Sequence, residues 1–273
     1  MVQADTRRPC VFCGHVRKLT REHLFRDSLK GRIPASPRLA RVRSDRSGYH
    51  DRTDMPVSIF DVTVREVCGP CNHGWMNDID VHVEDLLIEL ANGKRRDIPG
   101  SQIAGISRWA TRIALLRTLS ERARSGHADA SLFHDFFEDQ LPPSNTFIRV
   151  AILPHLAYEG GSNSYARFAP KHVDTGVTNL DEQSSLNVVV WGIGFLVVHV
   201  VLASSGQAVI VGRHIDRLLR MAGGAMPRVW PGPRRTVTVT SLANRRDLDQ
   251  LSSVGFLLHG DTPAAAPTFD DNT

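Results

Sequence analysis

Residues 64–76 read Val-Arg-Glu-Val-Cys-Gly-Pro-Cys-Asn-His-Gly-Trp-Met, and the two cysteines of this stretch decide the fold that we expect. The chain has only four cysteines, and they form two pairs of identical Cys-x-x-Cys spacing, Cys10 with Cys13 and Cys68 with Cys71. Each pair presents two thiolates on one turn, and Zn²⁺ favours four thiolates in a tetrahedron. A redox dithiol needs only one pair, and buried structural thiols need no such spacing. We therefore favour structural zinc over these two alternatives.

The 54 residues between the pairs contain an adjacent acid and histidine, Glu22 and His23, and Asn72 follows the last cysteine directly. On a strand, Glu22 and His23 would face opposite sides, so that one could hold a cation while the other faces a water molecule. Closure of the zinc site would bring all three residues together. Each also has a plain structural alternative: Glu22 in a first helical turn capped by Thr20, a buried His23, and Asn72 as a helix N-cap.

In this order, the two cysteine pairs, the acid-histidine pair and Asn72 resemble the HNH, or ββα-metal, nuclease family. The chain looks closest to the four-cysteine branch that includes phage recombination endonuclease VII, and residues 71–76 are similar to a segment of bacterial proteins assigned to the same family. The resemblance covers about residues 8–95. It implies a treble-clef zinc unit in a metal-dependent endonuclease that hydrolyses DNA phosphodiester bonds.

Carried over by position, the resemblance makes His23 the general base that activates water, and Glu22 and Asn72 the ligands of a catalytic divalent cation. Two protein ligands leave most of the coordination shell to water and phosphate, which suits Mg²⁺, and we also consider Mn²⁺. Three positions depart from the family's pattern. Glu22 stands where Asp is commoner, Met76 where a further His or Asn is frequent, and Trp75 where Lys is frequent.

Positive charge is concentrated at the start of the chain. Residues 1–52 hold 13 Lys/Arg against 5 Asp/Glu, a net of +8, whereas the remaining 221 residues hold 20 against 24, a net of −4. We expect this basic segment to contact the phosphate backbone of DNA, although RNA fits equally and a solvated Arg-rich loop is the alternative. The predicted phosphate contacts are Arg26, Arg32, Arg38, Arg41, Arg43 and Arg46.

The pattern along the chain predicts an α+β protein with its main boundary at Pro142-Pro143. We expect a flexible tail at 1–8, an HNH-like zinc nuclease domain at 9–95, a helical connector at 96–142, an α+β domain without an assigned role at 143–260, and a disordered tail at 261–273. Helices are predicted at 72–91, 101–124, 130–140, 215–221 and 245–252, with Gly93 ending the first. Strands are predicted at 59–67, 146–153, 185–191, 195–202, 208–212 and 236–242.

The composition excludes several classes of protein. With 273 residues, 41% apolar and 23% charged, the chain is neither collagen-like nor largely disordered, and four cysteines are too few for a secreted disulfide scaffold. Residues 188–203 contain 13 apolar side chains but also His199 and two glycines, so we expect two buried strands and no membrane span. No signal peptide is expected, and we predict a cytoplasmic location. Two other functions stay open: a zinc-stabilised nucleic-acid-binding protein without catalysis, and a protein-interaction module.

Overall fold

The structure is a computed structural model that describes residues 8–34, 39–44, 50–55, 58–120, 128–153, 160–168, 184–221, 226–232 and 235–242. Helices and sheets are mixed, which agrees with the α+β class. The helix predicted at 245–252 and the tail at 261–273 lie outside the described residues. The tail predicted at 1–8 is described only at Arg8, which belongs to the short strand β1 (Arg8–Pro9) paired with β2 (Val16–Arg17).

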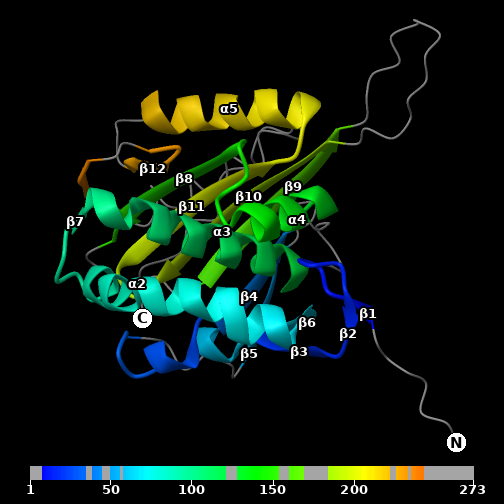
Figure 1. Cartoon of the computed structure of the whole chain (residues 1–273). Coiled ribbons are helices and arrows are strands. Elements are labelled where there is room, and N and C mark those ends of the chain that lie inside the picture. The colour runs from blue at the N-terminus through cyan, green and yellow to red at the C-terminus, as the bar shows by residue number, and fades with distance from the viewer. Residues whose placement is uncertain are drawn as a thin grey trace, which may run out of the picture.

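A five-stranded antiparallel sheet forms the centre of the molecule (Figure 1). Its order is β12 (Arg228–Trp230), β8 (Thr146–Ile152), β11 (Leu196–Ala203), β10 (Ser184–Ile193) and β9 (Gly160–Phe168). Every residue of β10 and β11 is buried, because both faces of the sheet are covered. The expectation of two buried strands within residues 188–203 is therefore confirmed. Within the described ranges, we find no helix both long and apolar enough to cross a membrane.

One face of the sheet is covered by helix α5 (Gly206–Met221), and this corrects the strand predicted at 208–212 (Figure 1). The β-branched run Val209-Ile-Val211 favours a strand by local propensity. The buried positions, however, recur at helical spacing, and Gly212 lets the helix come close to Val201 and Ala203 of β11. Tertiary packing therefore overrides local propensity. The buried side chains of α5 toward this face include those of Ala208, Ile215 and Leu219.

The opposite face of the sheet packs on α3 (Ile103–Ser120), and α2 (Asn77–Ala91) lies on the far side of α3 (Figure 1). Beyond these helices, β3 (Leu19–His23) pairs antiparallel with β6 (Thr63–Cys68). Helix α4 (Ala130–Asp139) reaches the first cysteine pair through Phe133, whose ring lies 5.3 Å from that of Phe12. Gly93 follows α2 with a φ of +69°, as expected for the residue that ends a helix.

Several short elements differ from the expectation. The strand predicted at 59–67 is a 3-10 turn (Ile59–Asp61) followed by β6. The helix predicted at 72–91 is interrupted at Gly74, whose dihedral angles are not helical. This residue lies in a π turn (Asn72–Met76) between the short α1 (Gly69–Cys71) and α2. Part of the basic segment, where no strand is predicted, forms a pair of antiparallel strands, β4 (Leu39–Ser44) and β5 (His50–Met55). Further turns lie at Asp27–Leu29 and Gly100–Gln102, and β7 (Asp97–Ile98) pairs with β13 (Val237–Thr238).

The core continues across the predicted boundary at Pro142-Pro143. One cluster of buried side chains runs from Phe12 through α2 and α3 to the strands of the sheet. At the tip of the β10–β11 hairpin, the backbone N–H of Phe195 donates to the carbonyl of Ala91 at the end of α2, at 2.8 Å. The division into domains stays a prediction, but the N-terminal unit and the sheet are packed together.

Candidate functional site

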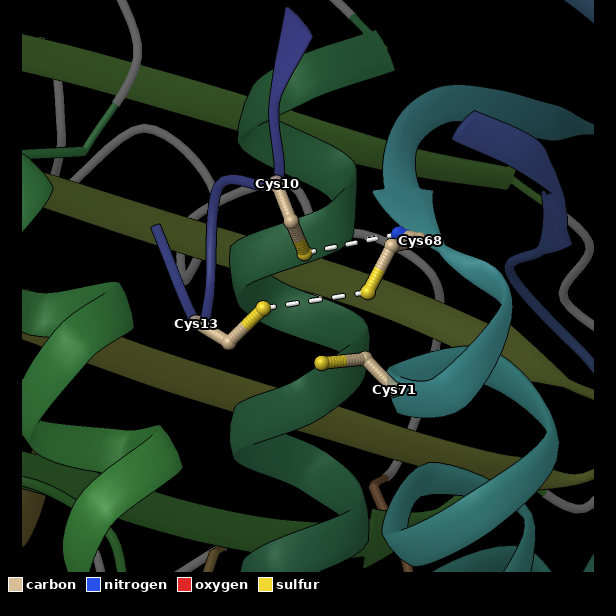
Figure 2. Close-up of side chains that lie close together, drawn as sticks. All are labelled: Cys10, Cys13, Cys68 and Cys71. Atoms are coloured by element: carbon tan, nitrogen blue, oxygen red, sulfur yellow. Dashed lines mark hydrogen bonds between the residues drawn. The ribbon is translucent and has the colours of Figure 1, made fainter. Parts of the chain in front are cut away.

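The four cysteines meet at one point, with their sulfur atoms all within 4.8 Å of one another (Figure 2). Cys13 Sγ and Cys68 Sγ are 3.7 Å apart. Four sulfurs at the usual Zn–S distance would be separated by about 3.8 Å, whereas a disulfide would bring two of them to about 2 Å. All four cysteines are free. The cluster can therefore hold a metal ion such as zinc, with Cys10 and Cys71 as the remaining ligands.

The pKa values of three of the thiols are shifted by burial and by their neighbours in the cluster. A hydrogen bond from Cys71 lowers the pKa of Cys10 to about 4, although burial opposes this shift. The same hydrogen bond, together with burial, raises the pKa of Cys71, and burial raises the pKa of Cys68. The negative charge of the Cys10 thiolate is one of the causes that raise the pKa of both of these neighbours. A divalent cation would allow all four to ionise.

Local turns position the two Cys-x-x-Cys segments, which we call the first knuckle (Cys10–Cys13) and the second knuckle (Cys68–Cys71). After Cys10, the backbone N–H of Gly14 donates to the carbonyl of Cys10 at 2.9 Å, and Gly14 takes a φ of +68° that favours glycine. The second pair is placed by β6, which ends at Cys68, and by Pro70 in the first turn of α1. The backbone N–H of Cys68 donates to Cys10 Sγ at 3.4 Å, and this bond ties the knuckles together (Figure 2).

Asn72, directly after the second knuckle, is fixed to strand β3. Its Nδ2 atom donates to Thr20 Oγ1 and to the carbonyl of Arg21, both at 3.0 Å. Its backbone is helical and its side chain caps no helix, so it is not an N-cap. Because Nδ2 is engaged, Oδ1 is the remaining polar atom, and among the described residues it accepts no hydrogen bond. The structure therefore brings Asn72 next to the strand that carries Glu22 and His23, as expected.

Strand β3 presents Glu22 and His23 to opposite sides. Glu22 is 5% exposed, whereas His23 is half-buried and Arg21 is exposed. A bulge on β6 places both Val64 and Val67 in the core although they are three residues apart. Neither the helical alternative for Glu22 nor the buried alternative for His23 holds. The imidazole of His23 makes no hydrogen bond with any described residue. Nearby, the hydrogen bond from Lys30 is the main cause that lowers the pKa of Asp61.

The carboxylate of Glu22 points into the protein. It lies 3.4 Å from the guanidinium of Arg112 on α3, which also forms a short ion pair with Asp80 on α2. Burial raises the pKa of Glu22 to about 7, although the charge of Arg112 opposes the shift. Burial likewise raises the pKa of Asp80. Glu22 is thus bound internally and does not share the outer side of β3 with His23.

Two of the six predicted phosphate contacts are already paired. Arg26 donates to Glu84 of α2 at 2.7 Å, and Arg32 binds the other oxygen of the same carboxylate. Arg41 and Arg43 lie on β4. Arg38 and Arg46 lie outside the described residues. Two arginines outside the predicted set, Arg21 and Arg65, are exposed on β3 and β6 and form no ion pair with any described residue.

Asp80 and Arg112 were missed as well, although the sequence contains a signal for them. Asp80 lies between the core residues Ile79 and Val83, and Arg112 lies between Trp109 and Ile113. A charge inside the apolar stripe of a helix is a candidate for a buried partner of opposite charge. Two such charges of opposite sign on successive helices indicate a buried ion pair between them.

The comparisons with known proteins add no family to this geometry. No family model, curated protein or solved structure matches the chain.

Proposed function

We propose that this chain is a metal-dependent endonuclease of the HNH type, with a treble-clef zinc unit that holds the reactive strand. One observation carries the proposal. Closure of the cysteine cluster places Asn72 against β3, where its side chain binds the carbonyl of Arg21, two residues before His23. The family resemblance expects this juxtaposition of histidine and asparagine from segments far apart in the chain.

In the proposed reaction, His23 accepts a proton from a water molecule as the water oxygen attacks phosphorus. The bond between phosphorus and the 3′ oxygen breaks, and the leaving oxygen takes a proton from solvent. A divalent cation such as Mg²⁺ or Mn²⁺, once bound, would stabilise charge on the phosphate and on the leaving oxygen. In this proposal, Asn72 would hold the cation through Oδ1, since its Nδ2 is engaged by Thr20 and Arg21. The half-buried imidazole of His23 has no competing hydrogen bond within the described chain, which leaves it free to meet water.

The second ligand expected from the resemblance, Glu22, is the part of this proposal that the geometry supports least. Its carboxylate is buried against Arg112. This observation favours a second candidate function, a zinc-stabilised nucleic-acid-binding protein that does not cleave. Both functions predict binding to DNA that weakens steeply as salt rises, because bound phosphates release counterions.

Cleavage of supercoiled plasmid in Mg²⁺ or Mn²⁺ tests the proposal directly. We expect His23→Ala, shown to be folded and loaded with zinc, to lower the cleavage rate by about 10²–10⁴-fold, the usual loss when a general base is removed. The matched control is His73→Ala, a neighbour of Asn72 with no proposed role, which should cleave at the unaltered rate. Equal nicking by the His23 variant would reject the assignment. Salt-dependent binding without cleavage by the unaltered chain would favour the second function.

The pairing of Arg26 and Arg32 with Glu84 gives a separate prediction for DNA binding. Glu84 is 15% exposed at its side chain, so it neutralises both arginines at close range. We expect Glu84→Gln to tighten DNA binding by about two- to tenfold at about 0.1 M salt and to steepen the salt dependence. Fluorescence anisotropy in EDTA measures this without cleavage. The control is Glu89→Gln on the same helix, α2, which removes the exposed ion pair of Glu89 with Arg95. Unchanged affinity in Glu84→Gln would exclude Arg26 and Arg32 as phosphate contacts.

A further inference from the structure

A buried cation and two buried acids join the strand that carries His23 to helices α2 and α3. Arg112 is 1% exposed, and Glu22 and Asp80 are 5% and 7% exposed. The guanidinium of Arg112 lies 3.4 Å from the carboxylate of Glu22 and donates to the carbonyl of Leu24 at 3.2 Å. Glu22 and Leu24 are the two neighbours of His23. Arg112 therefore holds β3 on both sides of the proposed general base.

We propose that Arg112 is a positioning residue for His23, and that Glu22 is the internal anchor for this contact and not a ligand of the catalytic cation. The positioning role rests on the proposed nuclease function, whereas the anchor is a property of the fold. Asp80 completes the group by binding the same guanidinium from α2.

The energetics of the group argue for a role in orientation. Buried ion pairs add little stability compared with apolar residues of the same shape, because removing charges from water is costly. Here two acids share one cation, and Asp80 Oδ1 is buried without a hydrogen bond within the described residues. An apolar cluster would satisfy the packing of α2 on α3 equally well. It would bind neither the carboxylate of Glu22 nor the carbonyl of Leu24, the two groups on either side of His23.

The direction of Glu22 argues against a cation ligand. Its carboxylate lies on the inner side of β3, in contact with Arg112. Asn72 and His23 are partly accessible, whereas Glu22 is buried. To reach a cation beside Asn72, Glu22 would have to leave Arg112 and abandon a charged group that is 1% exposed. Arg112 would then keep only Asp80 as an acidic partner among the described residues, and its contact with the Glu22 side of β3 would be lost.

The test uses the full chain with zinc bound, at a temperature at which each variant is folded. Plasmid cleavage is measured as kcat and KM for Arg112→Lys and Arg112→Met, and as a Mn²⁺ titration for Glu22→Gln and Asn72→Ala. The matched control is Arg149→Met, which breaks another buried ion pair, with Asp216 at 2.8 Å, between the sheet and α5. A double-mutant cycle of Glu22→Gln and Arg112→Met, read as urea midpoints, measures the anchor without any cleavage.

We expect both Arg112 variants to lose kcat by about tenfold or more with KM for DNA unchanged, since a small misplacement of a reacting group is costly. Arg149→Met should lower the urea midpoint but keep kcat. Asn72→Ala should raise the Mn²⁺ concentration for half-maximal cleavage, and Glu22→Gln should leave it unchanged. In the cycle, Arg112→Met should shift the midpoint less when Glu22 is already Gln.

Three results would overturn the proposal. A rise in the Mn²⁺ requirement of Glu22→Gln that matches Asn72→Ala would make Glu22 a ligand. Equal losses of kcat in Arg112→Met and Arg149→Met would show a general effect of stability. If the shifts of the urea midpoint in the two single variants add up to the shift in the double variant, Arg112 does not anchor Glu22. Absence of cleavage by the unaltered chain would reject the nuclease and the positioning role together, while the cycle would still decide whether Arg112 anchors Glu22.

Discussion

Cys71→Ser is expected to abolish stoichiometric zinc binding and to unfold the N-terminal unit around the knuckles. The purified chain should contain about one zinc ion, since its four thiol sulfurs lie within 4.8 Å of one another. A structural zinc site is tetrahedral and needs four ligands, so the loss of one thiolate leaves it open. Structural zinc in small domains contributes about 10–16 kcal/mol of binding free energy, which is folding free energy when the site does not exist in the unfolded chain. This is comparable to the whole stability of a typical domain, about 5–15 kcal/mol.

Metal analysis and thermal unfolding with and without a chelator measure this effect. Trp75 packs edge-on against Phe12, with ring centroids 5.4 Å apart, so its environment reports the loss of the first knuckle. His15→Ala and His73→Ala are the controls, because these histidines adjoin the cysteines without belonging to the cluster, and both should retain zinc. A Cys71→Ser protein with full zinc content and unchanged unfolding would exclude a structural four-cysteine site.

The sequence was sufficient to predict this cluster because its signal is local and redundant. Two pairs of identical spacing leave few geometries open, and the same pairs predict that Asn72 approaches the strand of His23. The direction of Glu22 could not be predicted. Alternation on a strand shows that Glu22 and His23 face opposite sides, but not which side is buried. That depends on Arg112, which is 90 residues further along the chain.

The fold, too, could be predicted where its signal is local, but not where it depends on contacts between distant segments. Residues 188–203 were predicted as two strands because glycine interrupts a run too rich in β-branched residues for a helix. The same reasoning failed at 208–212, where a β-branched run lies in α5. There, the deciding factor is a sheet surface that accepts a helix at Gly212, and no local pattern contains it. Pairing of the basic segment as β4 and β5 was missed for a similar reason, since its arginines mask any apolar alternation.

Gly194→Ala is expected to destabilise the protein by about 3 kcal/mol, because two independent penalties meet at this position. Gly194 has a φ of +56°, which an L side chain rarely adopts. A Cβ atom there would also lie 2.4 Å from the carbonyl oxygen of Ala91, the oxygen that accepts from the N–H of Phe195. That oxygen belongs to the backbone, so it can yield only if the hairpin tip and the end of α2 separate. The midpoint of thermal unfolding should fall by about 5 °C.

The control for this prediction is Gly31→Ala, which has a φ of +78° but no atom within 4 Å of an added Cβ. It carries the conformational penalty alone, about 1 kcal/mol, so the difference between the two variants measures the clash at Ala91. A large difference would mean that the sheet and the N-terminal unit unfold as one cooperative body, since the clash lies between them. Equal small losses would mean that the hairpin tip can leave α2 freely. In that case the β10–β11 contact would not support the helix that carries Asp80, and β3 would be held by its pairing with β6, by Arg112 and by the segment that follows the cysteine cluster.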